Sequence, residues 1–223
     1  MATRQSEFSI AVEDYAKAIY ALEEREGTVT TTALACRLGV TPASVSGMVR
    51  KLGELGLATH EPYKGVRLTD RGRTLALEIV RHHRLLETYL AESLGMPWDR
   101  VHAEAEVLEH HLSDELEARI AAKLGDPTHD PHGDPIPTVD LTLAADDTQA
   151  LAALEPGERA TLARVSDAEP EMLRYLSERG IAPGTEIEVV DKQPFGGPLF
   201  VNVGDATHAF GGRLADSMRV RAA

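Results

Sequence analysis

The sequence predicts a mainly α-helical protein with a small β component: an N-terminal winged helix-turn-helix, a helical middle domain and a C-terminal SH3-like β-barrel. Three observations support this fold class. Apolar residues recur at helical spacing up to about residue 124, and the period changes to two from Arg159 onward. Between these regions lies a proline-rich stretch without Lys or Arg, at residues 126–150. We therefore place the domains at residues 1–72, 73–140 and 156–223, with a linker at 141–155.

The composition limits the classes of function. The chain carries 23 Lys and Arg against 36 Asp and Glu, a formal net charge of −13. This balance argues against a protein that coats nucleic acid nonspecifically, but it permits a DNA reader with a local basic face. The single cysteine, Cys36, excludes an intramolecular disulfide and a Cys-rich zinc site, and we expect its thiol to be buried in a small helix. Because no apolar run reaches transmembrane length and the N-terminus has no secretory pattern, we expect a soluble, cytoplasmic protein with no membrane partner.

The N-terminal domain begins with a helix at about residues 12–26, with Asp14 in its first turn. Residues 30–52 then predict a helix, a turn and a second helix. Gly39 can end the first of these in a left-handed conformation. Thr41, followed by proline, can begin the second as its N-cap. This is a helix-turn-helix pattern.

DNA contact is predicted for the second helix of this pair and for a hairpin wing at residues 55–69. The segment 41–67 has a net charge of +2 in a chain of −13. Small side chains allow close approach to a duplex, and hydroxyl and cationic groups reach phosphates and bases. The alternative is a winged helix that makes only protein contacts. The candidate DNA-binding residues are Thr41, Ala43, Ser44, Ser46, Gly47, Arg50, Lys51, Lys64 and Arg67.

Two further helices form the middle domain. The first, at residues 70–94, carries His83 and Glu87 on one face, for which a surface pair is the alternative. The second is predicted to follow a turn at residues 95–99 and to continue towards residue 124. We expect this helical pair to form a dimerisation unit, since helix-turn-helix proteins usually bind two half-sites as dimers.

A cluster of acids and imidazoles lies on the second of these helices. His102, Glu106, Glu109 and His110 share an arc of roughly a quarter to a third of its circumference. Carboxylate and imidazole ligands without sulfur suit a divalent first-row metal such as Mn(II), Fe(II) or Zn(II). The alternative is a solvated polar face on a surface helix.

The remaining chain predicts an ordered turn and a small barrel. Residues 130–137 are expected to be ordered by their prolines. His129 and His132 could be metal ligands, although loop histidines beside proline are usually solvated. Strands of an SH3-style barrel are expected at residues 161–165, 186–190, 199–203 and 218–221, with a short helix at 170–179.

Three motifs carry a resemblance to a known family. They are Arg-His-His-Arg-Leu-Leu-Glu at residues 81–87, Glu-Val-Leu-Glu-His-His-Leu-Ser-Asp-Glu at 106–115 and Gly-Asp-Pro-Ile-Pro at 133–137. In this order, behind a winged helix and before a small barrel, they resemble the diphtheria-toxin-repressor family of metal-activated bacterial transcriptional repressors. The resemblance covers nearly the whole chain.

The resemblance implies a primary metal site of Asp14, Glu106, Glu109 and His110. The iron-responsive branch carries Met where Asp14 stands and Cys where Glu106 stands, whereas the manganese-responsive branch carries Asp and Glu. The chain is therefore similar to the manganese transport regulators, and oxygen ligands with one imidazole suit Mn(II). One departure is Lys17, which stands where short manganese regulators carry a second Glu and puts their paired-metal arrangement in doubt.

An ancillary metal site is implied by the longer members of the family. His83, Glu87 and His102 match its helical part. Barrel residues complete that site in the longer members, and Glu169 and Glu171, just before the barrel's helix, are the nearest matches.

The expected protein is thus a repressor activated by Mn(II) that controls manganese homeostasis genes. It is expected to bind a double-stranded DNA operator as a homodimer and to use no small-molecule substrate. Because Asp14 lies on the DNA-reading unit and the other ligands on the dimerisation unit, metal is expected to pin the first helix and fix the spacing of two recognition helices.

Other metals and other functions stay open at this point. Fe(II), Co(II) or Zn(II) could also bind in vitro, so an iron(II)-responsive or broad divalent-metal repressor is the alternative within the family. Outside it stand a metal-independent winged-helix regulator and a metallohydrolase. The chain has no His-Glu-x-x-His motif, and we expect that it is not an enzyme.

Overall fold

The computed structural model describes residues 7–61 and 65–222 of the chain. They divide into two compact units. Of the described residues, the first unit comprises 7–61, 65–83, 106–123 and 137–142, and the second comprises 84–105, 124–136 and 143–222. Two helices, α4 (Asp70–Leu94) and α5 (Trp98–Leu108), contribute residues to both units.

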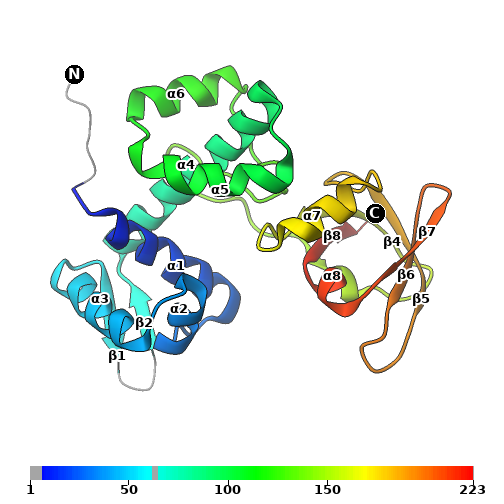
Figure 1. Ribbon diagram of the computed structural model, residues 1–223, viewed down its shortest axis with the longest axis horizontal. Coiled ribbons are helices and arrows are strands. Elements are labelled where there is room, and N and C mark those ends of the chain that lie inside the picture. Colours follow the sequence, from blue (N-terminus) through cyan, green and yellow to red (C-terminus); the bar gives the residue numbers. More distant parts are fainter. Residues whose placement is uncertain (1–6, 62–64, 223) are drawn as a thin grey trace. The chain divides into compact units, whose positions relative to one another are not determined.

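Three helices and a hairpin form the N-terminal part of the first unit (Figure 1). They are α1 (Ile10–Glu26), α2 (Thr31–Leu38), α3 (Pro42–Glu54), β1 (Ala58–Glu61) and β2 (Gly65–Leu68). The predicted winged helix-turn-helix is confirmed. Gly39 ends α2 with φ of 65°, and the Thr41 hydroxyl accepts the backbone N–H of Ser44 at 3.2 Å as the N-cap of α3. Ile19, Leu34 and Leu52 are fully buried among these helices, and each such side chain contributes roughly 1.5–3 kcal/mol of hydrophobic stabilisation.

Helix α1 is joined to the hairpin as well as to the other helices. The Glu23 carboxylate near its C-terminus accepts the backbone N–H of Leu68 in β2 at 2.9 Å. Just after the helix, the carbonyl of Val29 accepts the N–H of Val66 at 2.9 Å. Helix α1 and the residues just after it are therefore hydrogen-bonded directly to the wing strand β2.

The second helix of the middle domain is shorter than the sequence predicted. Instead of one helix to residue 124, α5 ends at Leu108, a 3-10 turn η1 (Glu109–His111) follows, and α6 (Asp114–Lys123) begins anew. The break has a local cause: Ser113 accepts the N–H of Glu117 on its carbonyl at 2.8 Å and that of Leu116 on its hydroxyl at 3.3 Å, as an N-cap does. With no Gly or Pro at this point, helical periodicity alone did not reveal the break.

A six-stranded antiparallel sheet forms the SH3-like domain in the second unit, with strand order β3-β8-β4-β5-β6-β7 (Figure 1). Its elements are β3 (Gln149–Ala150), the 3-10 turn η2 (Leu151–Ala153), β4 (Arg159–Val165), α7 (Pro170–Ser177), β5 (Glu186–Lys192), β6 (Leu199–Val203), β7 (Ala206–Phe210), α8 (Gly212–Asp216) and β8 (Met218–Ala222). Leu162, Leu173, Ile187 and Phe210 fill its core. Because β3 pairs with β8, the sheet begins inside the segment that the sequence suggested as linker 141–155.

The turn at residues 130–134 is held against β4. The His132 carbonyl accepts the N–H of Val165 at 2.9 Å. Gly133 adopts φ of 88°, and a Cβ built there would lie 2.0 Å from the carbonyl oxygen of Ala163, so no side chain fits. This close approach fixes His132 and Asp130 beside the sheet.

Two further findings concern the described residues. Cys36 is exposed, contrary to the expected buried thiol, because it follows Ala35 by about 100° around α2 and so leaves the buried side of that helix. No helix in residues 7–61 and 65–222 is long and apolar enough to cross a membrane.

Candidate metal centres

Asp14, Glu109 and His110 come together in the first unit, and we call this cluster, with Glu106, the first centre. Asp14 lies on α1, whereas Glu109 and His110 lie on η1. The Nε2 atom of His110 is 3.0 Å from Asp14 Oδ1 and 3.5 Å from Glu109 Oε1. One ligand atom from each of these three residues lies within 4.8 Å of the others. The break after α5 therefore turns Glu109 and His110 towards α1.

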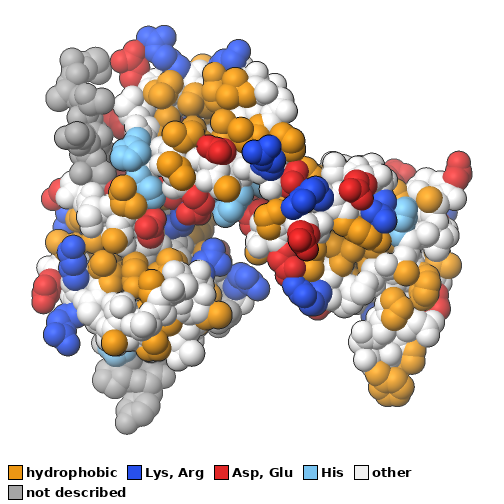
Figure 2. Space-filling model, viewed as in Figure 1, with side chains coloured by type: hydrophobic (Ala, Val, Ile, Leu, Met, Phe, Trp, Pro, Cys, Tyr) orange, Lys and Arg blue, Asp and Glu red, His pale blue; other side chains and the backbone are white. Residues whose placement is uncertain are grey.

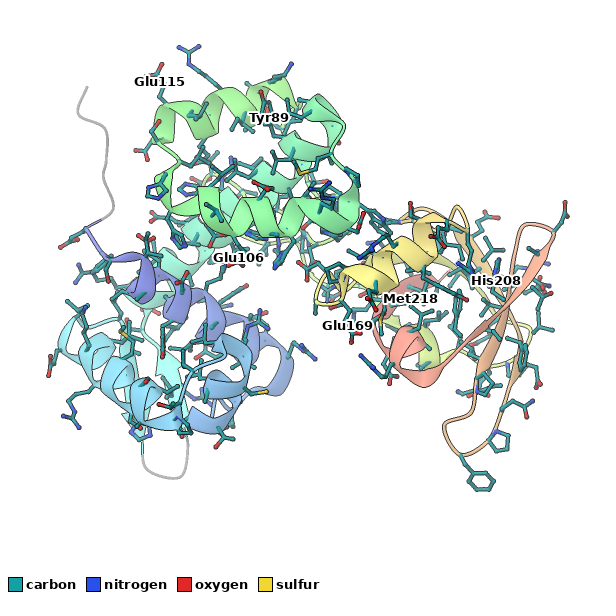
Figure 3. The ribbon with its side chains drawn as sticks, in the orientation of Figure 1. Tyr89, Glu106, Glu115, Glu169, His208 and Met218 are labelled. Atoms are coloured by element: carbon teal, nitrogen blue, oxygen red, sulfur yellow. The ribbon has the colours of Figure 1, made fainter. Side chains whose placement is uncertain are left out.

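Glu106 reaches the same place from α5. Figure 3 shows its side chain extending from α5 on the side of α1. A second group of ligand atoms within 4.8 Å of one another comprises His83, Glu106 and Glu109. Lys17 of α1 lies between the acids, with its Nζ 2.6 Å from Glu106 Oε1 and 2.6 Å from Glu109 Oε1. Burial lowers the pKa of Lys17, but the charges of Glu109 and Glu106 outweigh it and the net shift is upward.

Glu13 belongs to this centre as well, and sequence reasoning missed it. It is buried on α1, and its Oε2 accepts a hydrogen bond from Nδ1 of His110 at 2.6 Å. This contact fixes the ring so that Nε2 faces Asp14, as carboxylates do when they accept the other ring N–H of a metal-binding histidine. Burial lowers the pKa of His110, but the bonds to Asp14 and Glu13 raise it, to about 9 overall. The sequence shows an acid next to Asp14, but the contact of Glu13 with His110 depends on how α1 packs on η1.

Glu109 is the most enclosed ligand of the first centre. It is fully buried, and besides Lys17 it contacts His83, whose Nδ1 lies 2.5 Å from Oε2. The Glu109 carbonyl accepts a hydrogen bond from Nδ1 of His82 at 3.2 Å. Within the first unit, His83 is thus a partner of Glu109, and its assignment to the ancillary site stays a prediction. In Figure 2, histidine and acidic side chains gather next to one another beside α1.

A second centre surrounds Glu87 in the second unit. Glu87 is buried on α4, and its Oε1 lies 3.2 Å from Nδ1 of His102 on α5. Oδ2 of Asp167, from the loop between β4 and α7, lies 2.9 Å from the same nitrogen. Burial lowers the pKa of His102, but the bonds to Asp167 and Glu87 raise it, to about 10 overall.

His132 completes this second centre with Asp130, contrary to the solvated state expected for it. Its side chain is fully buried and stacks on Trp98, and Nε2 donates to the Trp98 carbonyl at 2.8 Å. Nδ1 then faces Oε2 of Glu87 at 3.6 Å and has no hydrogen-bond partner among the described residues. One ligand atom each from Glu87, Asp130 and His132 lies within 4.8 Å of the others. A buried nitrogen directed at a carboxylate, with its tautomer set by a carbonyl, has the arrangement of a metal ligand.

The two acids suggested from the sequence for the barrel side of the ancillary site lie elsewhere. Glu169, at the start of α7 beside α8 in Figure 3, pairs with Arg213 of α8. Glu171 is exposed in the first turn of α7. The structure brings Asp167 to His102 instead. Three acids fall within residues 167–171, where the loop after β4 leads into α7. No periodicity in this stretch indicates which of the three side chains turns inward.

Comparison with known proteins places the chain in a family. Residues 7–66 match the model of the iron dependent repressor N-terminal DNA binding domain, 69–138 match its metal binding and dimerisation domain, and 149–222 match the FeoA domain. The chain is 31% identical over 220 residues to the iron-dependent repressor IdeR of Mycobacterium tuberculosis, covering 93% of this chain and 95% of that protein. It is 36% identical over 192 residues to the diphtheria toxin repressor of Corynebacterium efficiens, covering 81% and 83%. The chain belongs to the iron-dependent repressor family.

Solved structures of related repressors agree with the fold. A manganese-dependent transcriptional repressor in complex with manganese superposes with a TM-score of 0.90 at 44% identity, covering 95% of this chain and all of that one. The repressor ScaR with bound Zn²⁺ gives 0.81 at 30% identity, covering 95% and 99%. As a member of this family, the chain is a metal-dependent, DNA-binding transcriptional repressor and not an enzyme.

The described candidate DNA-binding residues of this repressor lie on an exposed surface. The candidate DNA-binding residues on and before α3 are all exposed, and so is Arg67 on β2. They are Thr41, Ala43, Ser44, Ser46, Gly47, Arg50 and Lys51. Lys64 lies outside the described residues. Ser46 donates its hydroxyl to the Pro42 carbonyl at 3.0 Å, which leaves its oxygen able to accept from a partner.

Proposed function

We propose that this repressor is activated by Mn(II) held at Asp14, Glu106, Glu109 and His110, and that it controls manganese homeostasis genes in the cytoplasm. The observation that carries the proposal is the donor set of the first centre: Asp14, Glu109 and His110 lie together at the contact of α1 with η1, and Glu106 lies close to Glu109 in an overlapping group. Oxygen donors suit Mn(II), and thiol donors would favour softer ions. The sole cysteine is exposed on α2 and takes no part in this donor set.

The residues of the first centre connect the metal to the DNA-reading unit through α1. A divalent ion bound there would offset the repulsion between the carboxylates that lie close together. Asp14 near the start of α1 would hold the helix to η1, while Glu23 near its end holds the wing strand β2 at 2.9 Å. Metal that favours one position of α1 would therefore favour one placement of the recognition helix α3.

A homodimer on a two-fold operator is the arrangement we propose for DNA binding. The matched dimerisation domain includes α5 and α6, where Val107 is 66% exposed and Leu108 and Leu116 are also exposed. Apolar side chains of this size on a surface suit an interface between two copies. Two recognition helices would then read successive major grooves about 34 Å apart.

The second centre is proposed as an ancillary metal site of Glu87, His102, Asp130, His132 and Asp167. The buried Nδ1 of His132 supports it, because it faces Oε2 of Glu87 at 3.6 Å, which is longer than a hydrogen bond. The site joins two helices to the turn at residues 130–134 and to the loop after β4, all within the second unit. Its role would be to hold these segments together.

The experiment that tests the proposal is capture of genomic DNA fragments on the purified protein. It is run with chelator, with Mn(II), and with Fe(II) under anaerobic conditions. We expect discrete fragments upstream of metal-transport genes with Mn(II) and none with chelator. Equal retention with Fe(II) would contradict manganese selectivity, and retention in chelator would contradict metal activation.

A matched pair of variants locates the effect at the first centre. Glu109→Gln removes a buried ligand, whereas Glu115→Gln changes an exposed acid that pairs with Arg119 on α6. We expect Glu109→Gln to abolish Mn(II)-dependent DNA retention and Glu115→Gln to leave it unchanged. Metal-dependent retention by Glu109→Gln at unchanged Mn(II) sensitivity would contradict the assignment.

A further inference from the structure

We propose that Lys17 is the built-in counter-cation of the first centre. Its ammonium holds Glu106 and Glu109 when no metal is bound, and a divalent ion must displace it from Glu109 to bind. Lys17 thereby sets the metal concentration at which the repressor responds. This inference rests on the proposed assignment of Glu106 and Glu109 as ligands.

The geometry places the ammonium on the ligand atoms themselves. Lys17 Nζ lies 2.6 Å from Oε1 of Glu106 and 2.6 Å from Oε1 of Glu109. That Glu109 oxygen is also the one 3.5 Å from Nε2 of His110. A metal ion bound to this oxygen and this nitrogen would stand against the ammonium, and two cations so close in a buried place repel each other strongly.

The repulsion between the metal ion and the Lys17 ammonium is strong because Lys17 and Glu109 are buried. The Lys17 side chain is only 16% exposed and Glu109 is fully buried, whereas Glu106 is 41% exposed. Solvent therefore screens the pair with Glu109 much less than a surface ion pair. Lys17 can leave through the open side beside Glu106, but Glu109 cannot follow it into water.

The position of Lys17 in α1 explains why it competes for the centre. It lies one turn after Asp14 and after Glu13, so all three side chains project from one face of the helix towards η1. In the metal-free protein, Lys17 links α1 to Glu106 and Glu109, and bound metal links α1 to the same acids through Asp14. Metal binding then exchanges the single positive charge of the Lys17 side chain for the double positive charge of a metal ion from solution.

The exchange predicts a gain of metal affinity when the tethered charge is removed. Lys17→Met keeps the length and the apolar stem of the side chain but leaves Glu106 and Glu109 without this cation. We expect Mn(II) to bind the first centre about tenfold more tightly in Lys17→Met, a change of about 1.4 kcal/mol. Lys17→Arg keeps the charge and should stay within about threefold of the natural chain.

The test is titration of the metal-free, full-length protein with Mn(II), following free Mn(II) by electron paramagnetic resonance. Lys123→Met is the matched control, because it removes the same charge from an exposed position at the end of α6. Glu109→Gln identifies which class of binding sites is the first centre. Tighter binding in Lys17→Met alone supports the inference, and equal or weaker binding overturns it. If Glu109→Gln binds as the natural chain does, the proposed function fails instead.

A second measurement uses the natural sequence and does not depend on a variant that folds. Amine acetylation is followed by mass spectrometry at Lys17 and Lys123, with and without Mn(II). Displacement from Glu109 should make the Lys17 amine react several-fold faster in the presence of Mn(II), while Lys123 reacts at an unchanged rate. Unchanged or slower reaction of Lys17 overturns the inference.

Discussion

Replacing Asp167 by Asn would weaken the second centre without changing the size of the side chain. Oδ2 of Asp167 lies 2.9 Å from Nδ1 of His102, and it is the contact that brings the loop after β4 to α5. Burial alone raises the pKa of Asp167, but the hydrogen bond and charge of His102 lower it, and the net shift is downward. The carboxylate is therefore charged at neutral pH, and Asn removes that charge.

The size of the effect follows from this contact. A hydrogen bond between charged groups contributes about 1.5–3 kcal/mol when buried. The Asp167 and His102 side chains are 31% and 38% exposed, so screening reduces the expected loss to about 1 kcal/mol. For a chain of this length, such a loss lowers the Tm by about 2–4 °C. Mn(II) affinity at the second centre should fall at least about tenfold, as it does when a supporting residue of a metal site is lost.

Glu169→Gln is the matched control for this variant. It is also an acid-to-amide change, two residues further along, but Glu169 pairs with Arg213. The assay is calorimetric Mn(II) titration together with thermal unfolding of both variants and the natural chain. We expect Asp167→Asn to lose one class of binding site and Glu169→Gln to keep both. Loss of binding in Glu169→Gln with Asp167→Asn unchanged would refute the placement of Asp167 in the second centre.

Three further outcomes are expected. Glu117→Gln should destabilise the protein at about pH 7, because the bonds from His82 and Arg81 lower the pKa of Glu117 and stabilise its charged form in the folded state. The difference from the natural chain should vanish as the pH falls below about 4.5, since protonation of Glu117 removes this contribution. Urea unfolding at several pH values measures the difference, and a difference that does not change with pH would contradict the prediction. Gly133→Ala should lower the free energy of unfolding by roughly 3 kcal/mol in the same assay, since φ is 88° and the new Cβ would clash with a backbone carbonyl. An unchanged urea midpoint of unfolding would show that the turn can move. Arg50→Ala should weaken Mn(II)-dependent operator binding about tenfold and leave the Mn(II) affinity unchanged. Gel-shift titration measures the DNA affinity, and an unchanged value would exclude Arg50 from the DNA interface.

The sequence predicted the parts of the molecule that depend on local periodicity. The bounds of α4 agree with its apolar stripe, and Glu109 and His110 lie close to Asp14, while Glu106 lies close to Glu109. The division after Leu108 was not predicted, because its only local cause is the capping by Ser113. Strand β7 was also missed, since its Ala-Thr-His-Ala-Phe sequence has few of the β-branched residues that mark strands.

The residues of the two centres that the sequence did not assign were missed for one physical reason. Glu13, Asp167 and His132 reach their partners across segments that are far apart in the sequence. Helical spacing says which residues share a face, but it does not say which loop packs on that face. Asp167 and Glu169 were equally suitable by composition, and only the path of the loop between β4 and α7 separates them. His132 is buried because Gly133 permits a turn that few other residues can adopt.

The two centres differ in the kind of element that carries them, and this difference bears on their roles. The first is built from α1, α5 and η1, and α1 also holds the wing strand through Glu23. The second draws Asp130, His132 and Asp167 from loops, which it ties to Glu87 and His102. Metal at the first centre would therefore act on a helix that is joined to the wing, whereas metal at the second would restrain loops around the sheet. We expect loss of the first centre to abolish metal-dependent DNA binding, and loss of the second to reduce stability and metal stoichiometry first.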